Sequence, residues 1–148
     1  MNDIDNTEAE MIKQEEAIIR AAHKLKPLKI VLAEYSHSGL RILPRFLEDL
    51  NHEVIFADNG KEVVDVFLSM IDIDLIIMDI QMPIMDGFTA TQVIREFDKE
   101  IIIILLSATP IAEVEKHAIE VGIVINGYLQ KPMNIVELSA LLIKYFGK

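Results

Sequence analysis

Short apolar runs alternate with amphipathic segments from Pro27 to the end of the chain. The runs are apolar at nearly every position, which indicates strands that are buried on both faces. The segments between them repeat apolar residues at helical spacing, as Leu40, Leu43 and Leu47 do. This pattern predicts an α/β fold, in which five parallel strands form one sheet with helices on both sides. The predicted strands are 29–33, 54–57, 75–78, 101–106 and 127–129, and the five helices centre on 40–50, 63–67, 90–97, 111–118 and 138–145.

Residues 1–26 carry a different pattern, in which apolar residues such as Met11 and Ile18 recur at helical spacing among Glu and Lys. This spacing predicts an amphipathic helix that Pro27 ends. Its apolar stripe packs either on the following domain or on another chain. We therefore divide the chain into an N-terminal helix or connector, 1–26, and one domain, 27–148.

Composition narrows the class of protein. The 148 residues contain no cysteine, which excludes disulfides and thiolate metal sites. The formal net charge of −10 disfavours binding to nucleic acid. Mean hydropathy is positive at +0.32, but the longest apolar run, 101–106, is far shorter than the roughly 20 residues of a membrane span. The acidic start lacks a secretory signal, so we expect a soluble cytoplasmic protein without membrane insertion.

Polar residues follow four of the predicted strands. Glu34 follows the first, Asp79 the third, Ser107 the fourth and Lys131 the fifth. Function in an open parallel sheet gathers outside the carboxyl ends of the strands. We therefore expect two carboxylates, a hydroxyl and an ammonium to share one edge of the sheet.

Asp79 carries the most information of the four. An aspartate after a strand is often a helix N-cap, but the next helix begins only near Asp86. A carboxylate at this position can act as a nucleophile or as a ligand of a hard metal ion. Pro132 fixes the loop that carries Lys131 and permits a cis peptide bond before it. Lys131 could then lie over the carboxylates, and Ser107 could donate a hydrogen bond to an anion between them.

Three segments resemble the response-regulator receiver domains of two-component signalling. Residues 78–87, MDIQMPIMDG, are similar to the phosphoacceptor segment, above all in receivers of hybrid sensor histidine kinases. Residues 106–108, LSA, resemble the family's Leu-Thr/Ser-Ala step, and 128–132, YLQKP, its Tyr-x-x-Lys-Pro signature. The resemblance covers residues 28–146 with the elements in order. It implies a flavodoxin-like, doubly wound sheet with strand order 2-1-3-4-5.

The same resemblance implies a phosphoaspartate switch. Asp79 would take a phosphoryl group from a histidine kinase or a phosphotransfer protein. Mg²⁺ would bind the Asp79 carboxylate, the Gln81 backbone carbonyl and the acid Glu34. Lys131 and Ser107 would each contact a phosphoryl oxygen.

The resemblance also implies how a signal leaves the domain. Movement of the Ser107 loop would let Tyr128 turn inward and change a protein-binding face. The expected partners are the phosphodonor and a downstream protein, with no nucleic acid, and a homodimer is left open. Such a domain is no enzyme beyond Mg²⁺-dependent self-phosphorylation and autodephosphorylation. A stand-alone receiver and one module of a hybrid kinase both fit the sequence.

Tyr35 departs from the family pattern of two adjacent acids after the first strand. A neutral phenol is a poor ligand for Mg²⁺, so we expect weakened metal binding, with Glu34, Ser36 or His37 as replacement ligands. Two interpretations remain. The chain is a working receiver with an altered metal site, or a pseudo-receiver that acts as an interaction module without phosphorylation.

Pro44 is the second oddity of this region. The helix after the first strand should begin near Ser38, which would place Pro44 in its interior at a cost of about 3 kcal/mol. A later start or a kink would relieve that cost.

Two other classes fit the residues less well. Haloacid-dehalogenase-type phosphatases need a second aspartate two residues after the nucleophile, where this chain has Gln81. A flavodoxin-like cofactor binder needs a phosphate loop after the first strand, and Glu34 at its start would repel phosphate.

Overall fold

The computed structural model describes residues 3–34 and 41–147, and for residues 3–5 it describes the backbone alone. The chain comprises two compact units, which are described separately: Met1–Lys26 with Asn134–Lys148, and Pro27–Met133. Within the described ranges, no helix is both long enough and apolar enough to cross a bilayer.

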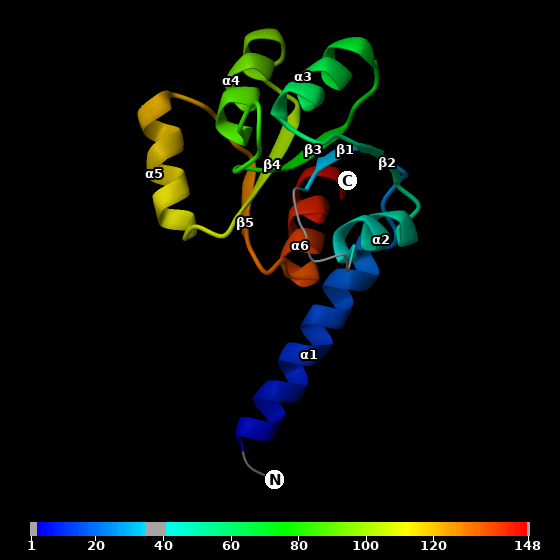
Figure 1. Ribbon diagram of the computed structural model, residues 1–148. Helices are drawn as coiled ribbons and strands as arrows, with labels where there is room; N and C mark the ends of the chain where they lie inside the picture. The colour runs from blue at the N-terminus through cyan, green and yellow to red at the C-terminus, as the bar shows by residue number, and fades with distance from the viewer. Residues whose placement is uncertain (1–2, 35–40, 148) are drawn as a thin grey trace. The chain divides into compact units, whose positions relative to one another are not determined.

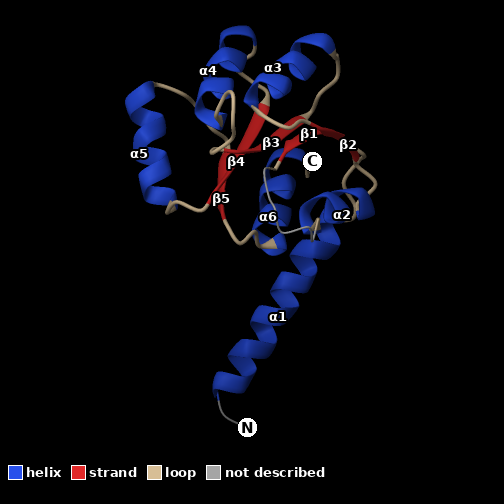
Figure 2. Cartoon of the chain, viewed as in Figure 1, coloured by secondary structure: helices blue, strands red, loops and turns tan. Residues whose placement is uncertain are grey.

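Five strands and six helices alternate along the described residues (Figures 1 and 2). All strand pairs are parallel, in the order β2-β1-β3-β4-β5, which confirms the predicted α/β class and strand order. The elements are α1 (Asp3–Ala22), β1 (Lys29–Ala33), α2 (Ile42–Asp49), β2 (Glu53–Phe56), α3 (Gly60–Ser69), β3 (Leu75–Asp79), α4 (Gly87–Phe97), β4 (Ile102–Ser107), α5 (Ile111–Val121), β5 (Gly127–Gln130) and α6 (Ile135–Phe146).

The central strands are buried on both faces, as their continuous apolar sequence predicts. Every residue of β3 is buried. Alternate residues of the strands, such as Val31 and Ile76, pack with α3, α4 and α5 in one core. The intervening residues, such as Ile30 and Leu75, are equally buried and face the side of the sheet on which α2 lies (Figure 1). This double coverage sets β3 rigidly in the middle of the sheet, with Asp79 at its carboxyl end.

The start of α2 decides between the expectations for Pro44. The helix begins at Ile42, which is the later start expected to relieve the cost of a proline, so Pro44 lies in its first turn and is buried there. Backbone N–H groups of a first turn have no intrahelical acceptor, and a proline therefore costs no hydrogen bond at this position. Arg41, the residue before the helix, has a left-handed φ of 50°.

In the other unit, α1 packs against α6. Leu138 and Leu142 of α6 are fully buried, and Asn134 caps the helix by accepting from the backbone N–H of Val136 at 2.8 Å. The helix α1 ends at Ala22, before Pro27, which corrects the predicted end. After Ala22 the backbone makes 3₁₀-type hydrogen bonds between residues three apart, such as that from the N–H of Lys24 to the carbonyl of Ala21. The α-helix has therefore ended before the chain reaches Pro27.

Candidate functional site

An open cavity of about 590 Å³ lies at the carboxyl ends of β3, β4 and β5. The structure brings Asp79, Ser107 and Lys131 together around it, although about 50 residues of chain separate the first from the last. The lining residues are Asp79, Gln81, Met82, Pro83, Asp86, Leu106, Ser107, Ala108 and Lys131.

Asp79 and Lys131, which both line this cavity, form an ion pair. The Nζ of Lys131 lies 2.8 Å from Oδ1 of Asp79, whose side chain is only 3% exposed. Asp79 caps no helix, as expected, because the N-cap of α4 is Asp86, which accepts from the backbone N–H of Thr89 at 2.7 Å. The ammonium of Lys131 therefore compensates a carboxylate that would be costly to bury alone.

Backbone hydrogen bonds hold Lys131 in place. Its N–H donates to the carbonyl of Ser107 at 2.8 Å, which joins the end of β5 to the end of β4. The peptide bond between Lys131 and Pro132 is cis. The loop that carries the cation is thus tied to the strand that carries the hydroxyl.

The loop from β3 to α4 is fixed by close backbone approaches. The N–H of Gly87 donates to the carbonyl of Ile80 at 2.7 Å, and that of Gly60 donates to the carbonyl of Met85 at 2.9 Å. A Cβ atom at Gly87 would lie 2.5 Å from the carbonyl oxygen of Asp79. A glycine at this position therefore sets how closely the start of α4 can approach the backbone at the end of β3.

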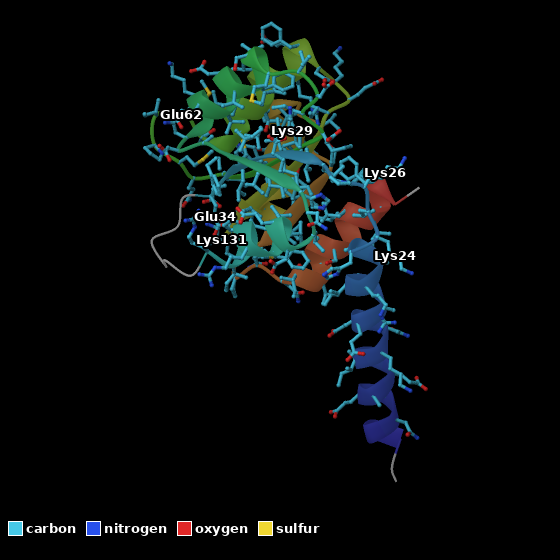
Figure 3. All side chains as sticks on the ribbon, turned by 90° about the vertical axis from the view of Figure 1, so that its right-hand side faces the viewer. Lys24, Lys26, Lys29, Glu34, Glu62 and Lys131 are labelled. Atoms are coloured by element: carbon cyan, nitrogen blue, oxygen red, sulfur yellow. The ribbon has the colours of Figure 1, made fainter. Side chains whose placement is uncertain are left out.

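Glu34, directly after β1, is a third charged side chain that interacts with Asp79 and Lys131. Burial raises the pKa of Glu34, the neighbouring Asp79 carboxylate raises it further, and Lys131 lowers it. Its Oε2 atom is buried and has no hydrogen-bond partner among the described residues. Figure 3 shows Glu34 and Lys131 at the same edge of their unit. Three charges of mixed sign therefore influence one another at this edge.

The oxygen atoms at this edge of the sheet suit a small hard cation only in part. The carboxylates of Asp79 and Glu34 and the cavity-lining Gln81 offer the oxygen ligands that Mg²⁺ prefers, and the unpartnered Glu34 oxygen supports such a use. Among the described residues, however, no three His, Cys, Asp or Glu side chains are grouped to hold a metal. Tyr35, Ser36 and His37, from which another ligand was expected, lie outside the described residues.

Ser107 and Tyr128 lie on neighbouring strands, but only Ser107 lines the cavity. The Oγ atom of Ser107 accepts from the backbone N–H of Thr109 at 3.0 Å. Tyr128 is half-buried against the core that α3, α4 and α5 share, and burial together with Glu115 of α5 raises the pKa of its phenol. A second position of the Tyr128 ring stays a prediction.

Comparison with known proteins identifies the family. The sequence model of one protein family, the response regulator receiver domain, matches residues 30–143. The chain is 35% identical over 112 residues to hybrid signal transduction histidine kinase E of Dictyostelium discoideum. That match covers 72% of this chain but only 6% of the kinase, so the chain spans a small part of this relative.

Solved structures agree with this assignment. The receiver domain of Ssk1, crystallised with the histidine phosphotransfer protein Ypd1 of Saccharomyces cerevisiae, is 27% identical with a TM-score of 0.72, and the match covers 83% of this chain and 91% of that one. The receiver domain of sensor kinase PA1611 from Pseudomonas aeruginosa is 26% identical with a TM-score of 0.70, over 83% and 100% of the two chains. In that structure a magnesium ion is coordinated in the active-site cleft.

Proposed function

Because the chain belongs to the response-regulator receiver domain family of two-component signalling, we propose that it accepts a phosphoryl group on Asp79 and thereby changes a protein-binding face. The observation that carries this proposal is the buried Asp79 carboxylate, paired with Lys131 at 2.8 Å in a cavity that Ser107 also lines. A buried acid, a fixed cation and a hydroxyl at one open site suit the transfer of an anionic group.

The proposed step forms one bond and breaks one. An oxygen of the Asp79 carboxylate attacks the phosphorus of a phosphohistidine, and the bond from phosphorus to the imidazole nitrogen breaks. The electron pair of that bond stays on the imidazole, and Asp79 becomes an acyl phosphate. Lys131 then exchanges its partner, from the Asp79 carboxylate to a phosphoryl oxygen, while Ser107 donates its hydroxyl hydrogen to another.

When bound, Mg²⁺ supplies positive charge that offsets the negative charge on the oxygens of the transferring phosphoryl group. In this chain Asp79, Glu34 and the backbone carbonyl of Gln81 would hold it. Since Tyr35 stands where the family carries a second acid, we propose that this chain binds Mg²⁺ weakly.

The proposed phosphodonor is a histidine kinase or a phosphotransfer protein. The support is the pairing of a similar receiver with a histidine phosphotransfer protein in the yeast complex. The output would pass to a downstream protein and not to nucleic acid, because the net charge of −10 repels a phosphate backbone. Ser107 and Tyr128 would relay the change, since a phosphoryl group that draws in Ser107 frees space beside Tyr128.

Labelling with acetyl phosphate in the presence of Mg²⁺ tests the acceptor. We expect intact-mass spectrometry to find one added phosphoryl group on the parent protein and none on Asp79→Asn, which lacks the nucleophile. The matched control is Asp86→Asn, because Asp86 lines the same cavity and asparagine preserves its helix cap. Labelling of Asp79→Asn equal to that of the parent would remove Asp79 from its proposed role.

A pseudo-receiver is the second candidate, and Tyr35 is the observation that favours it. We expect Tyr35→Asp to raise the affinity for Mg²⁺ by about tenfold, because it adds a charged oxygen ligand. Tyr35→Phe should leave the affinity at the parent value. Titration calorimetry measures both, and tight binding by the parent protein would contradict the proposed weakness. If only Tyr35→Asp is labelled by acetyl phosphate, the natural chain is the pseudo-receiver.

A further inference from the structure

The first turns of α1 are exposed along much of their length. Every residue from 6 to 17 is exposed, whereas Ile18 and Ile19 are half-buried and Ala22 is fully buried. Figure 1 shows α1 extending well beyond α6, the helix it packs against. Met11 and Ile12 are 55% and 56% exposed, so the apolar stripe continues along the exposed part of the helix.

Glutamates lie in the middle of this stripe and not at its edge. On a helix, residues three and four positions away are neighbours on the same face. The neighbours of Glu15 at these spacings are all apolar: Met11, Ile12, Ile18 and Ile19. Glu8 lies seven residues earlier in the same row, beside Met11 and Ile12. The face is therefore two apolar rows with an acidic row between them.

A central acidic row restricts what can cover the stripe. An apolar partner surface would bury carboxylates without compensation, which is strongly unfavourable. A second copy of α1 fits no better. In a parallel pair, Glu15 of one helix faces Glu15 of the other. An antiparallel pair that overlaps residues 11–19 is centred on Glu15, so the two Glu15 side chains also face each other there. Like charges would meet at the seam in both arrangements.

We infer that α1 binds an amphipathic helix of a partner protein in which Lys or Arg residues, seven positions apart, lie between two apolar rows. The basic side chains would pair with Glu8 and Glu15, and the apolar rows would cover Met11, Ile12 and their neighbours. The charge of the whole chain, −10, would steer such a cationic helix toward this one. The acidic row would exclude a second copy and thus select the partner.

Two synthetic helical peptides about three heptads long test this inference. Both carry the same leucine rows, and the central row holds lysines in one and glutamates in the other. With the full chain in titration calorimetry, we expect the lysine peptide to bind at least about tenfold more tightly than the glutamate peptide. The double variant Glu8→Lys/Glu15→Lys should reverse this preference.

The matched control is Glu10→Lys/Glu16→Lys, which makes the same change in net charge on the same helix outside the acidic row. It should keep the preference of the parent protein. Circular dichroism should find unchanged helix content in both variants, since Lys and Glu have similar helix propensities.

Two results would overturn the inference. One is binding of the two peptides with equal affinity, or of neither. The other is sedimentation of the parent chain as a dimer that Glu8→Lys/Glu15→Lys dissociates, which would make a second copy the occupant.

Discussion

The helices α4 and α5 have the same length, 11 residues, and share one core, but they are held at opposite ends. Asp86 caps the amino end of α4, and Gly87 brings that end against β3. Within the part of the chain that the structure describes, no side chain caps the amino end of α5, which starts after Pro110. Its carboxyl end closes instead on Gly122, at a left-handed φ of 75°.

Arg95 of α4 strengthens this contrast. Its guanidinium donates to the carbonyls of Val124 and Ile101, at 3.0 and 2.8 Å, and to Oδ1 of Asn126 at 3.0 Å. The same Asn126 oxygen accepts from the backbone N–H of Ile103 at 2.8 Å. These bonds attach the segment after α5 to the start of β4, so α5 is fixed where it ends.

The amino end of α5 is less firmly anchored than the amino end of α4. Only Val114 and Ala118 of α5 are buried, whereas α4 buries four residues: Gly87, Ala90, Thr91 and Ile94. The amino end of α5 also lies close in sequence to Ser107, which lines the cavity. A helix held less firmly beside the site than at its far end can change position at low cost, which suits the proposed switch.

Gly87→Ala should weaken the anchored end of α4 most. The new Cβ would lie 2.5 Å from the carbonyl oxygen of Asp79, so strand and helix must separate. We expect a loss of about 3 kcal/mol in the free energy of unfolding, measured by urea denaturation. Gly122→Ala is the control, because nothing lies within 4 Å of its Cβ and only the left-handed φ opposes it. It should cost about 1 kcal/mol, and equal losses would show that close approach is not what fixes α4.

Arg95→Ala should weaken the attachment of the carboxyl end of α5. We expect a loss of about 2 kcal/mol and faster hydrogen exchange at the amides of Ile103 and Asn126, because the segment after α5 and the start of β4 lose a shared charged donor. Arg45→Ala, at an exposed position of α2, should change neither quantity measurably. Unchanged exchange in Arg95→Ala would mean that α5 is held by Val114 and Ala118 alone.

Asp86→Ala should have the smallest effect, about 1 kcal/mol, since it removes one helix cap. Hydrogen exchange should quicken at Thr89 and stay as in the parent in α5. Asp86→Asn should restore the parent value, because an amide oxygen can accept the same hydrogen bond. An equal increase of exchange in both helices would show that their amino ends are coupled and not independently held.

Much of the fold and of the candidate site could be predicted from local patterns. Continuous apolar runs identified the five strands. Burial on both faces explains this for the central strands β1, β3 and β4, whereas every residue of the edge strand β2 is exposed or half-buried. Asp79 was singled out because it ends such a strand and caps no helix. For α2 the sequence left two possibilities, a start near Ser38 or a later one, because Pro44 is compatible with a helix only within its first turn. The structure shows the later start, at Ile42.

The bonds of Arg95 had no signal in the sequence. Its acceptors are backbone carbonyls, which every residue carries, and an asparagine 31 positions away. The strands, their class and the residues at their ends follow from the order of residues alone, because burial and backbone geometry act on neighbouring residues. The 2.8 Å pairing of Asp79 with Lys131, and the end at which each helix is held, arise only in the folded chain, because they depend on segments that meet in space after distant parts of the chain have packed.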